Sequence, residues 1–175
     1  MYRILDWYGA VRDFVELGGP VMVFIGLLTV TMWIMIFERV LYYRSEHRQL
    51  MVDAIGGWKA RRDRSSWNAH QIREAIVSRV GLSVEEHLPL LKTLVALCPL
   101  LGLLGTVTGM IEVFEVMAFS GTGNPRSMAA GVSKATIPTM AGMVSALSGV
   151  LAVTLLSRFA AREVEHLKAE LTIEV

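Results

Sequence analysis

Residues Pro99–Gly109, PLLGLLGTVTG, form an apolar run in which small residues recur along one side. The positions that set this segment apart are Pro99, Gly102, Gly105, Thr106 and Gly109. Small residues let helix backbones approach closely, and a threonine offers a hydroxyl where hydrocarbon offers no partner. A segment that only faced lipid would carry more large aliphatic side chains. We therefore expect this stretch to face other protein or a narrow polar path.

The composition of the whole chain predicts a membrane protein. Of its 175 residues, 53% are hydrophobic, which is high for an ordinary soluble domain. Three stretches approach the roughly 20 apolar residues that a helix needs to cross a bilayer. They lie at residues 18–38, at residues 93–117 and within residues 125–157. The segment before Pro20 carries acids and aromatics and does not resemble a cleavable signal. We predict an all-α polytopic protein with three transmembrane helices.

The distribution of Lys and Arg predicts its orientation. Thirteen of the 17 basic residues lie in the long loop at residues 39–92 or in the tail at residues 158–175. The positive-inside rule places both segments in the cytoplasm. The N-terminus and the short connection at residues 118–124 are then periplasmic, in a bacterial inner membrane.

Helical patterns continue outside the predicted spans. Residues 1–17 read as an amphipathic helix, which either lies in the outer interface or packs on a neighbouring subunit. The cytoplasmic loop and tail also read as helical. The basic loop is either a solvated face or a surface for anionic lipid or a cytosolic partner.

Local signals set the expected helix ends. The first helix is expected to continue to about Ile55, where Gly56-Gly57 would end it. Asn68 is the expected N-cap of the next helix, with Gln71 completing a capping box, and Trp67 with Ile72 as a hydrophobic staple. Asn124 and Pro125 are expected to start the third span.

The third span carries a stripe at helical spacing that includes hydroxyl groups. Its members are Thr136, Thr139, Met143, Ala146, Val150, Val153 and Ser157. Pro138 lacks an amide proton, so it frees the carbonyl of Lys134 and favours a kink. If Thr106 and Thr139 share one side of the hairpin, several copies around an axis would form rings of hydroxyls. The alternative is that these threonines bond carbonyls of their own helices and only mediate packing.

Other classes of site have no support in the sequence. Cys98 is the single cysteine and falls in an apolar span, where a small core residue is the simplest interpretation. The four histidines lie outside the spans, without the spacing of a metal pair. There is no nucleophile elbow, phosphate loop or zinc motif. We expect no catalytic residue, cofactor, metal or nucleic-acid partner.

The run PLLGLLGTVTGM, followed by KATIPTMAGMVSALSGV in the third span, resembles the ExbB/TolQ/MotA proton-channel family. The similarity is greatest to short ExbB-type subunits of TonB energy-transduction systems, and its specific part runs from about Pro99 to Arg158. It implies a homopentamer of three-span subunits around the membrane helices of ExbD-like partners. The partner helix carries the proton-bearing aspartate. The output would pass to a TonB-like protein for outer-membrane transport.

The resemblance also implies roles for individual residues. Thr106 and Thr139 match the threonine rings that line the pore. The helix-packing positions are Pro99, Gly102, Gly105, Gly109, Pro138 and Gly142. Relatives commonly have a glutamate five residues before the second threonine, whereas this chain has Lys134. A glutamate relay from this subunit therefore cannot be assumed.

Three charges are expected near the outer rim of the membrane. Glu112 and Glu115 share a helix face, and Lys134 lies at similar depth in an antiparallel hairpin. We predict that Lys134 pairs with one of these glutamates, within or between subunits. The alternative is that Lys134 extends independently into the lipid headgroups. At the level of function, a TolQ-like subunit serving envelope integrity and a non-conducting membrane scaffold remain the alternatives.

Overall fold

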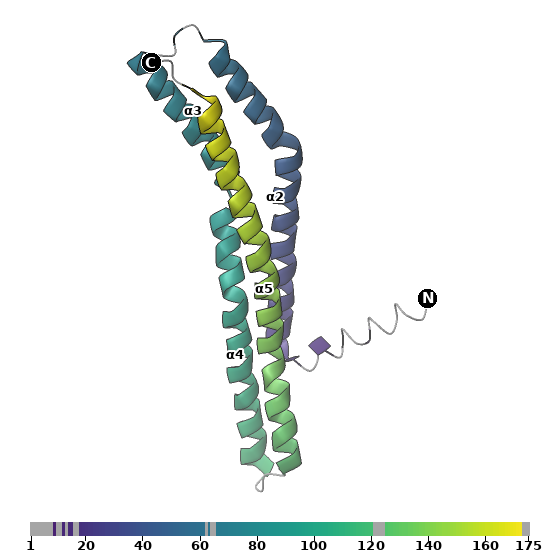
Figure 1. Cartoon of the computed structure of the whole chain (residues 1–175). Helices are drawn as coiled ribbons and strands as arrows, with labels where there is room; N and C mark the ends of the chain where they lie inside the picture. Colours follow the sequence, from purple (N-terminus) through teal and green to yellow (C-terminus); the bar gives the residue numbers. More distant parts are fainter. Residues whose placement is uncertain are drawn as a thin grey trace. The chain divides into compact units, whose positions relative to one another are not determined.

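The protein is a succession of long helices (Figure 1). The computed structural model describes residues 18–61, 63, 66–120 and 125–172, together with Gly9, Arg12, Phe14 and Val15. Its elements are α2 (Pro20–Lys59), α3 (Trp67–Glu85), α4 (Leu88–Ser120) and α5 (Pro125–Glu170). No strand occurs among the described residues, so the all-α prediction is confirmed. The amphipathic helix predicted at 1–17 falls largely outside the described residues, as does the predicted cap Asn124.

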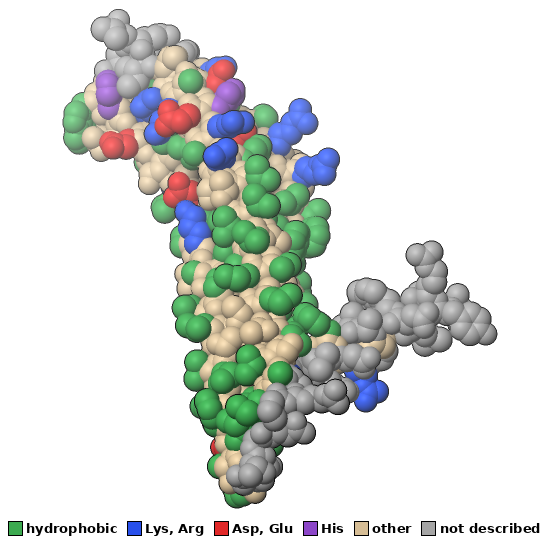
Figure 2. Space-filling model, turned by 60° about the horizontal axis from the view of Figure 1, so that its bottom comes forward, with side chains coloured by type: hydrophobic (Ala, Val, Ile, Leu, Met, Phe, Trp, Pro, Cys, Tyr) green, Lys and Arg blue, Asp and Glu red, His purple; other side chains and the backbone are tan. Residues whose placement is uncertain are grey.

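Three helical stretches are long and apolar enough to cross a membrane. They are Pro20–Ser45, Trp67–Phe119 and Gly131–Glu170, and each covers most of one of the three apolar stretches found in the sequence. Only 22% to 28% of the most apolar window in each is buried within the chain. Figure 2 shows hydrophobic side chains standing out along the surface of the helices. Most of this apolar surface is therefore available to lipid or to other chains.

The chain divides into two compact units, each built from segments distant in sequence. Unit 1 contains Met1–Trp33 and Thr93–Val150. Unit 2 contains Ile34–Lys92 and Leu151–Val175. How residues 39–92 and 158–175 lie relative to a membrane stays a prediction.

In unit 1, α4 and α5 run antiparallel and α2 packs on both of them. Cys98 on α4 and Met32 on α2 are fully buried, and Ile25 is 2% exposed. The buried positions on α5 are Ala135, Pro138, Gly142, Ala146 and Gly149. The stripe noted in the sequence is buried only in part, since Ala146 and Val153 are buried whereas Met143 and Val150 are exposed. Four of the buried positions lie one residue before a member of that stripe, and Ala146 belongs to both sets. The small residues among them admit the neighbouring helices.

In unit 2, large side chains fill the space between helices. Trp58 is 1% exposed, and its indole Nε1 donates to the carbonyl of Thr172 over 3.2 Å. Leu167 and Leu171 are fully buried. The expectation that Gly56-Gly57 ends the first helix is wrong, since α2 continues to Lys59. Burial of Trp58 stabilises this last turn despite the low helix propensity of glycine.

The predicted cap of α3 is also wrong. Ser66 is the N-cap, and its hydroxyl accepts from the amide of Ala69, whereas Asn68 lies inside the helix. The carboxylate of Asp63 accepts from the amide of Ser66 at 3.0 Å, which fixes the entry of the chain. Trp67 is 74% exposed, so it does not form the predicted staple.

The start of α4 follows from Pro89. A proline in the first turn of a helix loses nothing, whereas inside a continuous helix it would remove a backbone bond. The chain therefore breaks at Glu86-His87 and α4 begins at Leu88. His87 adopts a left-handed conformation with φ of 64°.

Candidate functional site

The candidate site in unit 1 is built on a seam of close backbone contacts between α4 and α5. A Cβ atom added to Gly102 would lie 3.0 Å from the carbonyl oxygen of Pro138 and from the Cα of Thr139. One added to Gly142 would lie 2.5 Å from the carbonyl oxygen of Cys98. One added to Gly109 would lie 2.8 Å from the Cβ of Ala135. Only glycine permits this spacing of the two backbones.

Pro138 occupies the centre of the seam. Its ring packs onto Gly105, where an added Cβ would lie 2.8 Å from the proline Cγ. The same added atom would lie 3.4 Å from Val21, so α2 closes over this point. Proline has no amide proton to offer, so Pro138 leaves the carbonyl of Lys134 without its helical donor, and Pro99 does the same for Val95. Gly102, Gly105 and Pro138 thus meet at one contact, and Gly109 and Gly142 lie at other points along the same seam.

The two threonines singled out by the sequence have different hydrogen bonds. The hydroxyl of Thr139 donates across the seam to the carbonyl of Gly102 at 3.1 Å. The hydroxyl of Thr106 donates to Leu103 in its own helix at 2.7 Å. Both side chains are half-buried. Bonding within the same helix therefore describes Thr106, whereas Thr139 joins two helices.

These bonds define what the hydroxyls can do chemically. A threonine hydroxyl has one hydrogen and two acceptor lone pairs. In both Thr106 and Thr139 the hydrogen is already directed to a backbone carbonyl. Each oxygen can still accept from a protonated carboxyl group. To donate to a carboxylate, either hydroxyl would have to give up its carbonyl.

The three predicted rim charges are all exposed. Lys134 lies next to Ala135, which packs on Gly109, about one turn from Glu112 along α4. In the part of unit 1 that the structure describes, no ion pair within the chain joins Lys134 to Glu112 or Glu115. A pair between two copies of the chain stays a prediction.

A second polar contact in unit 1 was missed by the sequence reasoning. The hydroxyl of Thr29 on α2 donates to the hydroxyl oxygen of Ser145 on α5 at 3.0 Å. The carbonyl of Ile25, 2.7 Å from the same hydroxyl, is the second acceptor within reach of its one hydrogen. Both are polar residues within apolar spans, which was the signal available in the sequence.

Gly149 was missed as well, although it lies seven residues after Gly142 and so on the same face of α5. A Cβ added there would lie 2.6 Å from the sulfur of Met32 and 2.6 Å from Val95. Helices α2, α4 and α5 therefore meet at this glycine.

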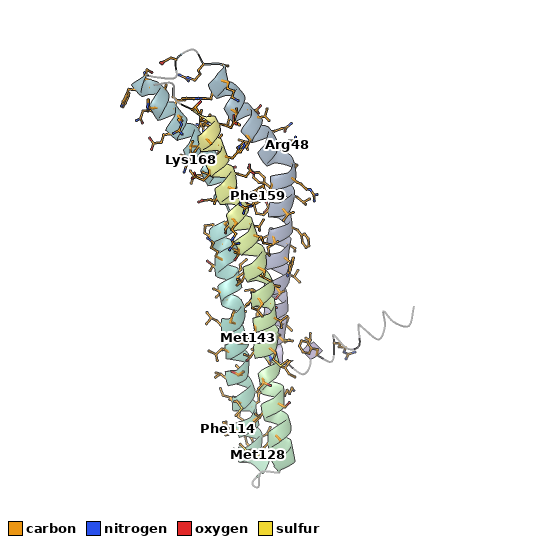
Figure 3. The ribbon with its side chains drawn as sticks, viewed as in Figure 1. Arg48, Phe114, Met128, Met143, Phe159 and Lys168 are labelled. Carbon is orange, nitrogen blue, oxygen red and sulfur yellow. The ribbon has the colours of Figure 1, made fainter. Side chains whose placement is uncertain are left out.

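Large apolar side chains point away from the seam. Phe114 on α4 and Met143 on α5 are 58% and 57% exposed (Figure 3). Further exposed residues on α4 are Leu100, Leu103, Leu104 and Val107. Within the described residues there is no group of three or more His, Cys, Asp or Glu side chains suited to a metal ion. The site thus offers hydroxyls and apolar contacts.

Comparison with known proteins gives a consistent result. The profile of the MotA/TolQ/ExbB proton channel family matches residues 36–169. A putative biopolymer transport protein, ExbB-like 1 of Synechocystis sp., is 39% identical over 83 residues, which are 46% of this chain and 33% of the relative. The biopolymer transport protein exbB1 of Vibrio cholerae is 42% identical over 82 residues, or 46% of this chain and 36% of the relative.

A relative from a different system is similar to a comparable degree. The Tol-Pal system protein TolQ of Pseudomonas aeruginosa is 35% identical over 94 residues, covering 54% of this chain and 39% of the relative. In each of these three comparisons the chain spans less than two fifths of the curated relative.

Proposed function

This chain belongs to the MotA/TolQ/ExbB proton channel family, and from this we propose that it is the ring-forming subunit of an inner-membrane proton motor. In this proposal five copies enclose the membrane helices of ExbD-like partners. Proton flow through the complex drives movement of those helices. A TonB-like protein transmits the movement to outer-membrane transporters.

The hydrogen bond from Thr139 to Gly102 is the observation that carries this proposal. It holds a hydroxyl at the seam with its hydrogen directed to a carbonyl and its lone pairs available. Such an oxygen accepts from a neutral, protonated carboxyl group and offers no hydrogen to an ionised one. A partner aspartate would therefore pass this point in its protonated form. The apolar surroundings raise the cost of an unaccompanied charge, which limits leak.

The energy available suits such a mechanism. One elementary charge crossing 100 mV releases about 2.3 kcal/mol. A pH difference of one unit adds about 1.4 kcal/mol per proton. A few protons would thus supply enough free energy to move one helix past packed neighbours.

TolQ-like service to envelope integrity is the second candidate, because the TolQ relative from Pseudomonas aeruginosa is similar to this chain to about the same degree as the ExbB relatives. The ExbB-like and TolQ-like functions differ in the partner proteins that they require. Co-purification separates them, since a TonB-like partner supports the first function and a Tol-type partner the second.

Substitution of Thr139 tests the proposed proton path. Thr139→Val keeps the side-chain volume and removes the hydroxyl, so we expect proton flux to fall by about tenfold to a hundredfold while the ring assembles normally. Thr139→Ser should restore most of the flux. Proton uptake is measured in membranes containing the full chain and its single-span partner, and assembly by native mass spectrometry.

Thr136→Val is the matched control. Thr136 is exposed and bonds Ser133 in its own helix, three residues before Thr139. Its substitution should leave flux unchanged. Equal flux in wild type and Thr139→Val, with intact rings, would contradict a proton path at Thr139 and favour a non-conducting scaffold.

A further inference from the structure

The joint between α3 and α4 in unit 2 is held by a buried arginine. Arg39 on α2 is 1% exposed, and its guanidinium reaches the last turn of α3. Nη1 lies 3.4 Å from the carbonyl of Ser83, and Nη2 donates to the carbonyl of Glu86. Arginine thereby satisfies carbonyls that a helix C-terminus leaves without donors.

The same guanidinium also contacts His87. Nη2 lies 2.9 Å from Nδ1 of the imidazole. Arginine has only donors and does not lose its proton in proteins. For this contact to be a hydrogen bond, the imidazole Nδ1 must be the acceptor and so must carry no hydrogen. In this geometry the closed joint requires an unprotonated histidine.

Protonation of His87 would reverse this contact. An N–H group would then face the N–H of Arg39, and two positive charges would lie within hydrogen-bonding distance. His87 is exposed, so protons from water reach it freely. Imidazole is also the side chain whose charge changes between about pH 5 and 8.

The other charged and titratable groups around the joint do not supply a strong counter-charge. Tyr42 on α2 lies with its ring centroid 5.0 Å from the guanidinium carbon, and Tyr43 is its neighbour. The carboxylate of Glu86 is 3.8 Å from Nη2 but 63% exposed, so water and salt screen it. Other charged side chains on these elements, all exposed, are Glu38 and Arg44 on α2, Arg79 and Glu85 on α3, Lys92 on α4, and Arg158 and Arg162 on α5.

We propose that Arg39 and His87 form a proton-sensitive latch, in which neutral His87 holds the α3–α4 joint on α2 and protonated His87 releases it. The closed joint binds one proton fewer than the open joint. Its stability is therefore present at neutral pH and is lost as the pH falls. The latch goes beyond the proposed function and rests on unit 2 alone, so it holds for this chain whether or not protons pass at Thr139.

Hydrogen exchange of the full chain in lipid nanodiscs at pH 7.5 and pH 5.5 tests the latch, after correction for intrinsic exchange rates. The reporting amides are those of Glu86, bonded to Leu82, and Leu91, bonded to His87. We expect both to exchange about tenfold faster at the lower pH. Amides at 160–167 of α5 should show no corrected change. Absence of faster exchange at the joint would overturn the proposal.

Three substitutions separate the latch from general acid sensitivity. His87→Asn keeps a residue that tolerates left-handed φ and an oxygen that accepts from Arg39, but it cannot titrate. It should keep the protection at pH 7.5 and abolish the pH dependence. A pH dependence that survives in His87→Asn would contradict the latch.

The other two substitutions are controls. His70→Asn alters an exposed histidine whose ring contacts Ser66, and it should retain the wild-type pH dependence. Tyr42→Phe removes the 2.6 Å hydroxyl contact with Ser83 and should reduce protection by the same factor at both pH values. If His70→Asn abolished the pH dependence, the effect would not originate at His87.

Discussion

The helices within unit 1 and the helices within unit 2 pack by different kinds of contact. In unit 1 the closest contacts join backbone to backbone, as where Gly142 meets the carbonyl of Cys98. In unit 2 the helices are kept apart by large buried side chains, among them Trp58 and Leu167. Arginine side chains then reach the carbonyl ends of helices, Arg39 at α3 and Arg73 at Lys168 and Leu171 near the end of α5.

The difference is the one expected if unit 1 lies in hydrocarbon and the segments of unit 2 predicted to be cytoplasmic lie in water. Between helices in hydrocarbon there is little hydrophobic driving force, so close packing of small residues supplies the attraction. In water, burial of a large apolar side chain is itself strongly favourable. A long arginine can also cover apolar surface with its stem while its guanidinium donates to carbonyls. The two units therefore respond differently to gain or loss of side-chain volume.

The largest expected effect is loss of volume in unit 2. Trp58→Ala should reduce the free energy of unfolding by about 3–5 kcal/mol, because it removes a buried indole and its bond to Thr172. Chemical unfolding followed by circular dichroism in mixed micelles measures this. Trp67→Ala serves as the control, since Trp67 is 74% exposed, and should change stability by less than about 0.5 kcal/mol. Equal losses of stability in the two tryptophan variants would contradict the conclusion that large buried side chains stabilise unit 2.

Gain of volume in unit 1 comes next. Gly142→Ala places a methyl group against the carbonyl of Cys98, so α4 and α5 must separate, at a cost of about 1–3 kcal/mol. Gly26→Ala is the matched substitution in α2, where an added Cβ meets nothing within 4 Å. It should be neutral or slightly stabilising. The same unfolding measurement applies. An unchanged free energy of unfolding in Gly142→Ala would contradict close packing of α4 against α5 at this position.

The smallest expected effect concerns the hydroxyl contact between α2 and α5. Ser145→Ala removes the acceptor of the Thr29 hydroxyl and should cost about 0.6 kcal/mol, a typical value for hydrogen bonds between membrane helices. Ser148→Ala is the control, because the hydroxyl of Ser148 donates to the backbone carbonyl of Ser145 within the same helix. We expect it to have less effect in the same unfolding assay. A larger loss in Ser148→Ala would mean that hydroxyls stabilise α5 itself rather than its contact with α2.

The apolar spans and the small-residue seam could be predicted because composition and spacing report them directly. Gly102, Gly105 and Gly109 recur at steps of three and four, which places them on one helix face. Which face of α5 is buried could not be predicted in this way. One stripe begins at Thr136 and another at Ala135, and both recur with the spacing of a helix. Only the contacts with α4 show that the stripe beginning at Ala135 is the buried one.

Helix ends were harder to predict because tertiary contacts decide them. Ser66 and Asn68 are both good capping residues, and the bond from Ser66 to Asp63 selects the first. Gly56-Gly57 lowers helix propensity, but the buried Trp58 outweighs it. Arg39 directly follows the first predicted span, and its carbonyl partners lie more than 40 residues away in the sequence, where no local pattern indicates them.

Met32 illustrates a chemical consequence of the tight contact at Gly149. Its side chain is fully buried, and its sulfur would lie only 2.6 Å from a Cβ atom added to Gly149. Oxidation to the sulfoxide would add a polar oxygen that this space cannot hold. Met140 and Met143, at 61% and 57% exposed, can take up that oxygen without disturbing the helices. The packing of unit 1 thus directs oxidative damage to its surface and spares the thioether at its centre.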